Sequence, residues 1–131
     1  MSRVPRLGRL VLPLLLLFGF PAQAEAVEVQ VEVGTSLACG TQEQVERFVA
    51  LYDGDAQSTV NSVNAAEHDP SACTVSTMAY LRGRPLATAR NKDTTFQIVP
   101  ILVLGVVSEA GVESVTPGSF FSVFEVEEIG I

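Results

Sequence analysis

Residues 39–52 read CGTQEQVERFVALY, and this stretch sets the helical part of the fold. Thr41 followed by Gln44 three residues later is the capping-box pattern of a helix N-terminus. Apolar residues then recur at the spacing i, i+3, i+4, i+7, which predicts an amphipathic helix of about 11 residues. These residues are Val45, Phe48, Val49 and Tyr52. Asp53-Gly54 marks the predicted end of the helix.

A second, shorter helix is predicted directly after the first. Asp55 can cap its N-terminus, and Val60 and Val63 follow at helical spacing. The hydroxyl and amide residues around these valines are weak helix formers. The sequence His68-Asp69-Pro70-Ser71 is expected to end the helix.

Strand patterns flank the helices. From Val27 to Val33 valine alternates with Glu28, Gln30 and Glu32, which predicts a half-buried strand with one acidic face. Residues 34–40 are expected to form a loop that carries Cys39.

Beyond Cys73 the chain is rich in β-branched and aromatic residues separated by short turn signals. Pro100 indicates an edge position, a bulge or a break in its strand, and Thr116-Pro117-Gly118 interrupts the last one. In the last strand both faces are apolar, so we expect it to be covered on both sides. The expected strand segments are Thr74–Leu81, Leu86–Arg90, Thr94–Val107, Val112–Val115 and Ser119–Val126.

This element order predicts an α+β fold, with two N-terminal helices after an initial strand packed on an antiparallel β-meander. Residues 25–131 are expected to form this single small domain. Residues 1–24 have the features of a cleavable signal peptide: three arginines, an apolar run from Leu10 to Phe20, and Ala22-Gln23-Ala24 as a cleavage site. The apolar run is about half the length that spans a membrane.

Composition restricts the function classes. The chain has 131 residues, with 8 basic and 15 acidic side chains and a net charge of −7. This acidic balance argues against a dedicated nucleic-acid binder. One His and two Cys cannot build the usual zinc site, and 47% hydrophobic residues exclude a disordered chain.

Cys39 and Cys73 are the only cysteines. In an exported protein we expect them to form one structural disulfide that ties the entrance of the first helix to the start of the meander. Their spacing does not fit a redox C-x-x-C pair, and no His or basic cluster stands nearby to activate a thiol.

Motifs of catalysis are sparse. His68 is the only imidazole, and its neighbour Asp69 does not make a catalytic pair by adjacency, so a surface loop histidine is the expectation. Asp53-Gly54-Asp55 lacks the further ligands of a calcium loop and fits a helix break with a fresh N-cap. We therefore predict no catalytic residue, metal or cofactor.

One segment of the chain has an unusual density of positive charge. Four basic residues and no acid lie in a short segment, which we call the basic window: Arg82, Arg84, Arg90 and Lys92. If residues 86–90 form an edge strand, Arg82, Arg84 and Arg90 share one parity along the chain, so they could share one face and bind an anion or a partner. The alternatives are a solvated hairpin, or cross-strand pairing with acids such as Glu28, Glu32, Glu125 or Glu127.

Residues 41–49 and 89–92 resemble segments of small exported bacterial proteins of unknown function. The resemblance implies a periplasmic or secreted location and carries over no active residue. The leading hypothesis is a non-enzymatic module that binds a protein or a small anionic ligand, with no nucleic acid as partner and no membrane span after cleavage. The alternatives are a small periplasmic hydrolase and an envelope-associated structural protein.

Overall fold

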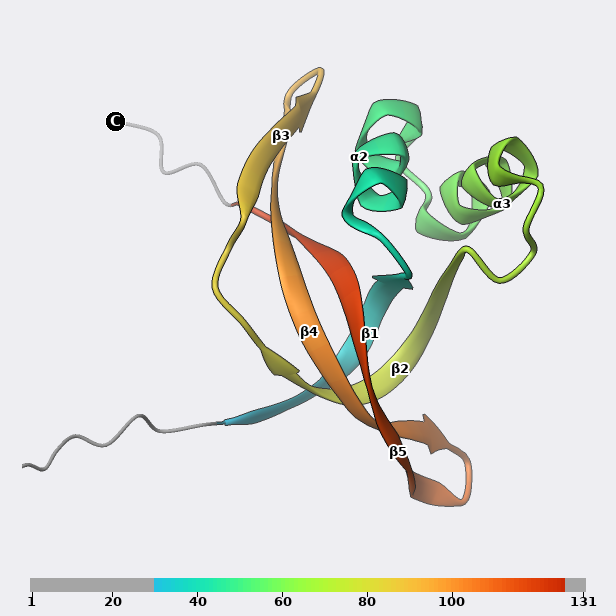
Figure 1. The fold of residues 1–131 in the computed structure, drawn as a ribbon, viewed down its shortest axis with the longest axis vertical. Helices are drawn as coiled ribbons and strands as arrows, with labels where there is room; N and C mark the ends of the chain where they lie inside the picture. Colours follow the sequence, from blue (N-terminus) through green and yellow to red (C-terminus); the bar gives the residue numbers. More distant parts are fainter. Residues whose placement is uncertain (1–29, 127–131) are drawn as a thin grey trace, which may run out of the picture.

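The computed structural model describes residues 30–126, and the predicted signal peptide, Val27 and Val29 lie outside this range. Within it the expected order of one strand, two helices and a run of strands is confirmed (Figure 1). All strand pairings are antiparallel, so the fold is α+β. The elements are β1 (Val31–Cys39), α2 (Gln42–Leu51), α3 (Ala56–Glu67), β2 (Cys73–Arg82), β3 (Ala87–Asn91), β4 (Thr94–Ser108) and β5 (Gly111–Glu125).

The five strands within residues 30–126 form one sheet that curls back on itself. β4 pairs with β5 on one side, and on its other side its partner changes from β3 to β2. β2 pairs along the whole of β1, and β1 meets β5 at one bridge, Cys39 opposite Phe121. Figure 1 shows the resulting coiled sheet, with both helices beside one of its ends.

Pro100 lies where β4 changes partners. The β3 ladder ends at Ile98 and the β2 ladder begins at Ile101. Gly83 donates its N–H to the Pro100 carbonyl at 2.8 Å, and the Leu86 N–H reaches the Ile98 carbonyl at 2.7 Å. β4 itself runs unbroken through Pro100, which stays paired with Phe121 of β5. A proline has no N–H to leave unpaired on the side without a ladder partner, so the local edge position is the alternative that the structure adopts.

Leu104 marks a second irregularity. It is an extra residue in β4 opposite the Ala79–Tyr80 step of β2, and the β4–β5 register shifts at the same place. On β5 the residues without a β4 partner are 115–117, so the predicted interruption near Thr116-Pro117-Gly118 is a bulge within one continuous strand.

The helices begin as their sequences predict. The Thr41 hydroxyl accepts from the Gln44 N–H while the Gln44 side chain accepts from the Thr41 N–H. Asp55 caps α3 by accepting the Ser58 N–H. The predicted apolar stripes of both helices are buried against Leu37, the disulfide and Ile98: Val45, Phe48, Val60 and Val63.

The opposite face of the sheet carries its own core. Ala38, Met78, Tyr80, Ile101 and Val103 are buried there, with Phe120 and Phe124 packed against them. Because Phe121 and Val123 pack on the helix side, both faces of β5 are covered, as predicted.

Two expectations about β1 are wrong. The strand continues to Cys39, so residues 34–39 are not a loop. Val31 and Val33 are 56% and 60% exposed, while Glu32 is half-buried. The burial is inverted at this end because the Glu32 side chain is covered by its contacts with Tyr80 and Arg82, whereas Val31 and Val33 point to the opposite, open face.

Candidate functional site

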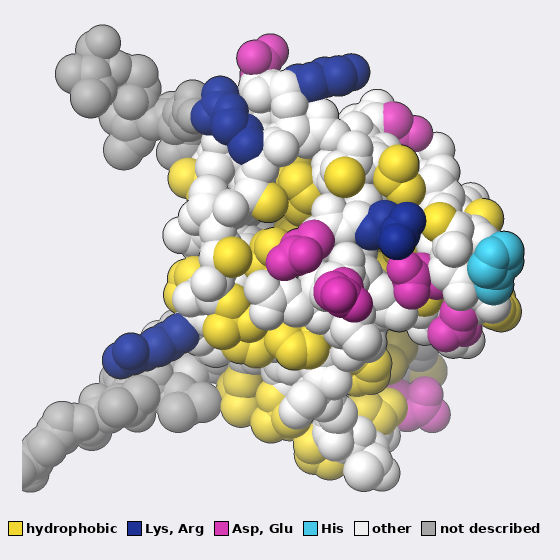
Figure 2. All heavy atoms as spheres, turned by 45° about the horizontal axis from the view of Figure 1, so that its top comes forward, with side chains coloured by type: hydrophobic (Ala, Val, Ile, Leu, Met, Phe, Trp, Pro, Cys, Tyr) yellow, Lys and Arg dark blue, Asp and Glu magenta, His cyan; other side chains and the backbone are white. Residues whose placement is uncertain are grey.

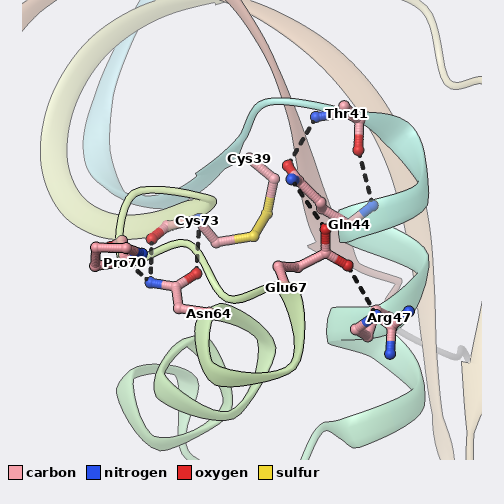
Figure 3. Close-up of a disulfide and its surroundings, with 8 residues drawn as sticks. All are labelled: Cys39, Thr41, Gln44, Arg47, Asn64, Glu67, Pro70 and Cys73. Carbon is pink, nitrogen blue, oxygen red and sulfur yellow. Dashed lines mark hydrogen bonds and ion pairs between the residues drawn. A yellow bond between two sulfur atoms is a disulfide. The ribbon is translucent and has the colours of Figure 1, made fainter.

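The disulfide organises the junction of strands and helices (Figure 3). Cys39 and Cys73 lie directly opposite each other, with Cα atoms 4.1 Å apart, which confirms the predicted bond. The Asn64 amide donates to the carbonyls of Pro70 and Cys73, and its oxygen accepts the Cys73 N–H at 2.9 Å. Asn64 therefore fixes the chain between α3 and β2.

The same junction joins the two helices through polar side chains. Glu67 at the end of α3 pairs with Arg47 of α2 at 3.0 Å and accepts a 3.4 Å hydrogen bond from Gln44. Figure 3 shows Gln44 linked both to Glu67 and back to Thr41. The polar side chains at this junction therefore hold α2 and α3 together.

The basic window does not form one strand face. Arg82 ends β2, Arg84 lies in the connection to β3, Arg90 belongs to β3, and Lys92 lies in the β3–β4 turn. The face-sharing argument required residues 82–90 to follow one strand, and the connection breaks that parity. In Figure 2 the blue side chains of the visible face stand at separate places with acidic groups between them.

Arg82 adopts the cross-strand alternative. Its guanidinium holds Glu32 through two nitrogens at 2.9 and 2.7 Å and lies 3.5 Å from the centre of the Phe124 ring. The hydrogen bond from Arg82 lowers the pKa of Glu32, and the same contact raises the pKa of Arg82. Tyr80 adds a 3.4 Å hydrogen bond to Glu32.

Arg90 and Lys92 take part in the turn itself. Arg90 donates to the Lys92 carbonyl at 3.3 Å and to the Thr95 hydroxyl at 3.0 Å. Lys92 adopts a left-handed conformation with φ of 54°. These contacts give the Arg90 side chain and the Lys92 backbone structural roles in the β3–β4 turn.

His68 and the Asp53-Gly54-Asp55 segment lie at helix ends. His68 is the left-handed C-cap of α3, and the histidine, cyan in Figure 2, is exposed. Asp53 accepts hydrogen bonds from Ser58 and from the Asp55 N–H, and these lower the pKa of its carboxyl. Within residues 30–126 no three His, Cys, Asp or Glu side chains gather as a metal site.

The candidate binding site is a cleft between β1 and β5, which we call the β1–β5 cleft. It has a volume of about 230 Å³ and opens beside the Cys39–Phe121 bridge, where the two strands separate. Aromatic rings from both helical and sheet elements line it, and Tyr52 meets Phe96 edge-on with ring centres 5.2 Å apart. Its lining is Thr35, Ser36, Leu37, Phe48, Tyr52, Ala56, Val75, Phe96, Val123, Phe124 and Glu125.

Backbone groups of β1 point into this cleft. Gly40 donates its N–H to the Ala72 carbonyl at 3.1 Å in the same register as the Cys39–Cys73 pair. Hydrogen-bonded and non-hydrogen-bonded pairs alternate along an antiparallel ladder. The even residues of β1 therefore bond to β2, and the backbone groups of Thr35 and Leu37 face away from β2.

The facing edge of β5 has the matching polarity. Val126 donates to the Thr95 carbonyl at 2.8 Å, in register with the Phe96–Glu125 pair. By the same alternation, the backbone groups of Val123 and Glu125 point away from β4, toward β1. Beyond the Cys39–Phe121 bridge the part of the chain that the structure describes has no further β1–β5 pair.

Sequence reasoning missed this cleft. Its lining comes from β1, α2, α3, β2, β4 and β5, and no local motif marks residues brought together from so many elements. The one available signal was the two-sided apolar pattern of the last strand, which indicated packing on both faces.

Comparison of the chain with protein-family models, with curated proteins and with solved structures finds no match. None of the helices in residues 30–126 has the length and apolar character needed to cross a membrane.

Proposed function

We propose that the chain is an exported, non-enzymatic binding module that holds an extended peptide in the β1–β5 cleft. The observation that carries the proposal is the pair of open strand edges facing each other over an aromatic floor. Added strands bind through main-chain hydrogen bonds, and side-chain pockets select their sequence. Thr35 and Leu37 offer such groups on one side, and Val123 and Glu125 on the other.

The lining predicts what the peptide carries. The rings of Phe48, Tyr52 and Phe96 favour apolar side chains on the face of the peptide that points to the helices. Glu125 is the one charged residue among the described lining residues and is exposed, so it favours a basic side chain at one end of the peptide. The disulfide supports export, because such bonds persist in oxidising compartments.

Screening the disulfide-bonded protein against a displayed library of short linear peptides tests the proposal. We expect enrichment of peptides with apolar residues at alternate positions. Isothermal titration of a selected peptide then compares two variants of one residue. Thr35→Pro removes an N–H from the open edge, where proline is tolerated, and Thr35→Val keeps that N–H.

Both variants lose the 3.0 Å contact between the hydroxyls of Thr35 and Thr77, so they differ in the N–H and the ring alone. We expect Thr35→Pro to weaken binding at least tenfold and Thr35→Val to change it little. Equal affinities of the two variants, or a library that yields no alternating pattern, would contradict strand addition in the cleft.

Self-assembly is a second candidate function, supported by the N-terminal part of the open β1 edge. Val31 and Val33 are exposed there, and the only charge of this stretch, Glu32, is already paired with Arg82. Edge strands normally carry unpaired charges that block such pairing. Light scattering over a concentration series would show dimers that Val33→Lys abolishes; a monomer at every concentration would exclude this candidate.

A further inference from the structure

A second hollow, which we call the hairpin hollow, lies on the other face of β1 and β2. The β2–β4 ladder ends where Met78 meets Val106, although both strands continue beyond this pair. The extra residue Leu104 and the unpaired residues 115–117 of β5 bend the hairpin that β4 and β5 form at this level. The space between the hairpin and the start of β2 has a volume of about 260 Å³.

The lining residues of this hollow that the structure describes are all uncharged, in a chain with 15 acidic residues. Its floor consists of Ala38, Met78 and Val103, each of them less than a tenth exposed. Hydroxyl groups stand higher, with Ser76 half-buried and Thr74 and Thr116 exposed. The remaining lining residues are Val106, Val115, Gly118 and Phe120.

We infer that the hairpin hollow binds a neutral, mainly apolar small molecule that carries a hydroxyl or carbonyl group at one end. An apolar cavity of about 150 Å³ accepts benzene, so this volume suits a body of about ten non-hydrogen atoms. The hydroxyls at the mouth supply hydrogen bonds to the polar end. A charged ligand is disfavoured because the lining offers no group of opposite sign to offset its desolvation.

Met78 gives a direct reporter, because Met1 and Met78 are the only methionines of the chain. The protein labelled with methyl-¹³C methionine is titrated with 2-naphthol and, separately, with 2-naphthoate, which carries a carboxylate on the same ring system. We expect a saturable shift of the Met78 methyl resonance with 2-naphthol and at least tenfold weaker binding of 2-naphthoate. Absence of a saturable shift, or equal affinity for the two probes, would overturn the inference.

Two neighbouring residues of β2 provide matched variants. Ser76→Phe fills the hollow, whereas Thr77→Phe adds the same ring on the opposite face of the strand, where Thr77 contacts Thr35. Binding of 2-naphthol should weaken at least tenfold in Ser76→Phe and persist in Thr77→Phe. If circular dichroism shows that Ser76→Phe does not fold, Thr116→Phe at the exposed mouth of the hollow replaces it in the test. Unchanged 2-naphthol affinity in whichever of the two variants folds would contradict the site.

Discussion

At the scale of single residues, Ser122 is the least satisfied group of the sheet. Its side chain is fully buried, and its hydroxyl has no hydrogen-bond partner among the described residues. A buried polar group without a partner costs about 1–3 kcal/mol. We expect Ser122→Ala to raise the free energy of unfolding by about 1 kcal/mol in urea titrations. The exposed Ser119 provides the control, and a destabilised Ser122→Ala would show that the hydroxyl has a partner in solution.

Glu32 connects a single ion pair to the pH dependence of stability. The hydrogen bond from Arg82 lowers the pKa of Glu32 in the folded state below its ordinary value of 4.5. The stabilisation is therefore fully present above that value and is lost as pH falls through the lowered folded-state pKa. Both partners are more than a third exposed, so solvent screening limits the contribution to about 1 kcal/mol or less.

Glu32→Gln should therefore reduce stability slightly at pH 7 and differ less from the parent near pH 3. Urea midpoints at the two pH values measure this, with Glu113→Gln on exposed β5 as control. A Glu32→Gln variant that loses as much stability near pH 3 as at pH 7 would show that the ion pair is not the cause.

At the scale of elements, the C-terminal end of α2 is capped by Asn91, which ends β3 in the β3–β4 hairpin. The Asn91 amide donates to the carbonyls of Val49, Ala50 and Tyr52 at 2.7, 3.2 and 3.2 Å. Asn91→Ala leaves these helix-terminal carbonyls without this donor and should cost about 1–2 kcal/mol. Asn91→Asp should cost more, because its carboxylate faces the negative end of the helix dipole.

Thermal unfolding of Asn91→Ala and Asn91→Asp orders the two costs. The nearby exposed substitution Thr88→Ala is the control for the hairpin itself. If Asn91→Asp proves as stable as Asn91→Ala, the amide does not act as the cap of α2.

The helices were predictable from sequence because their signals are local. Thr41 and Gln44 form the capping box within one turn, and the apolar stripe needs only helical spacing. The burial of β1 was not predictable in this way. Alternation separates two faces without saying which one is covered, and the answer came from Arg82, 50 residues away.

The candidate site shows the same limit more strongly. The basic window was visible as a run of charge, yet its Arg82 is committed to Glu32, which the cross-strand alternative named. The β1–β5 cleft depends on where two strands separate, and this follows from how the whole sheet coils. Such non-local geometry leaves no motif in either strand.

At the scale of the whole molecule, the disulfide holds the point where the curled sheet closes. Cys39 is bonded to Cys73 on β2, and the same residue makes the single bridge to Phe121 on β5. The covalent bond closes a chain segment with a sequence separation of 34. The chain-entropy model assigns such a loop about 3–4 kcal/mol, a large share of a small domain's stability.

Replacing both cysteines by alanine should therefore lower the free energy of unfolding by about 3–4 kcal/mol, measured by urea titration of the oxidised parent and the variant. The variant with serine at both positions should be less stable still, because it adds two buried hydroxyls that need hydrogen-bond partners. Because Cys39–Phe121 is the only β1–β5 pair within residues 30–126, removing the disulfide should also weaken the pairing of these two strands. We expect hydrogen exchange to accelerate first at the Phe121 amide in the folded alanine variant, whereas the β4–β5 ladder near Val99 stays protected. Equal acceleration of hydrogen exchange at both sites would show that the disulfide stabilises the whole domain and does not specifically hold β1 against β5.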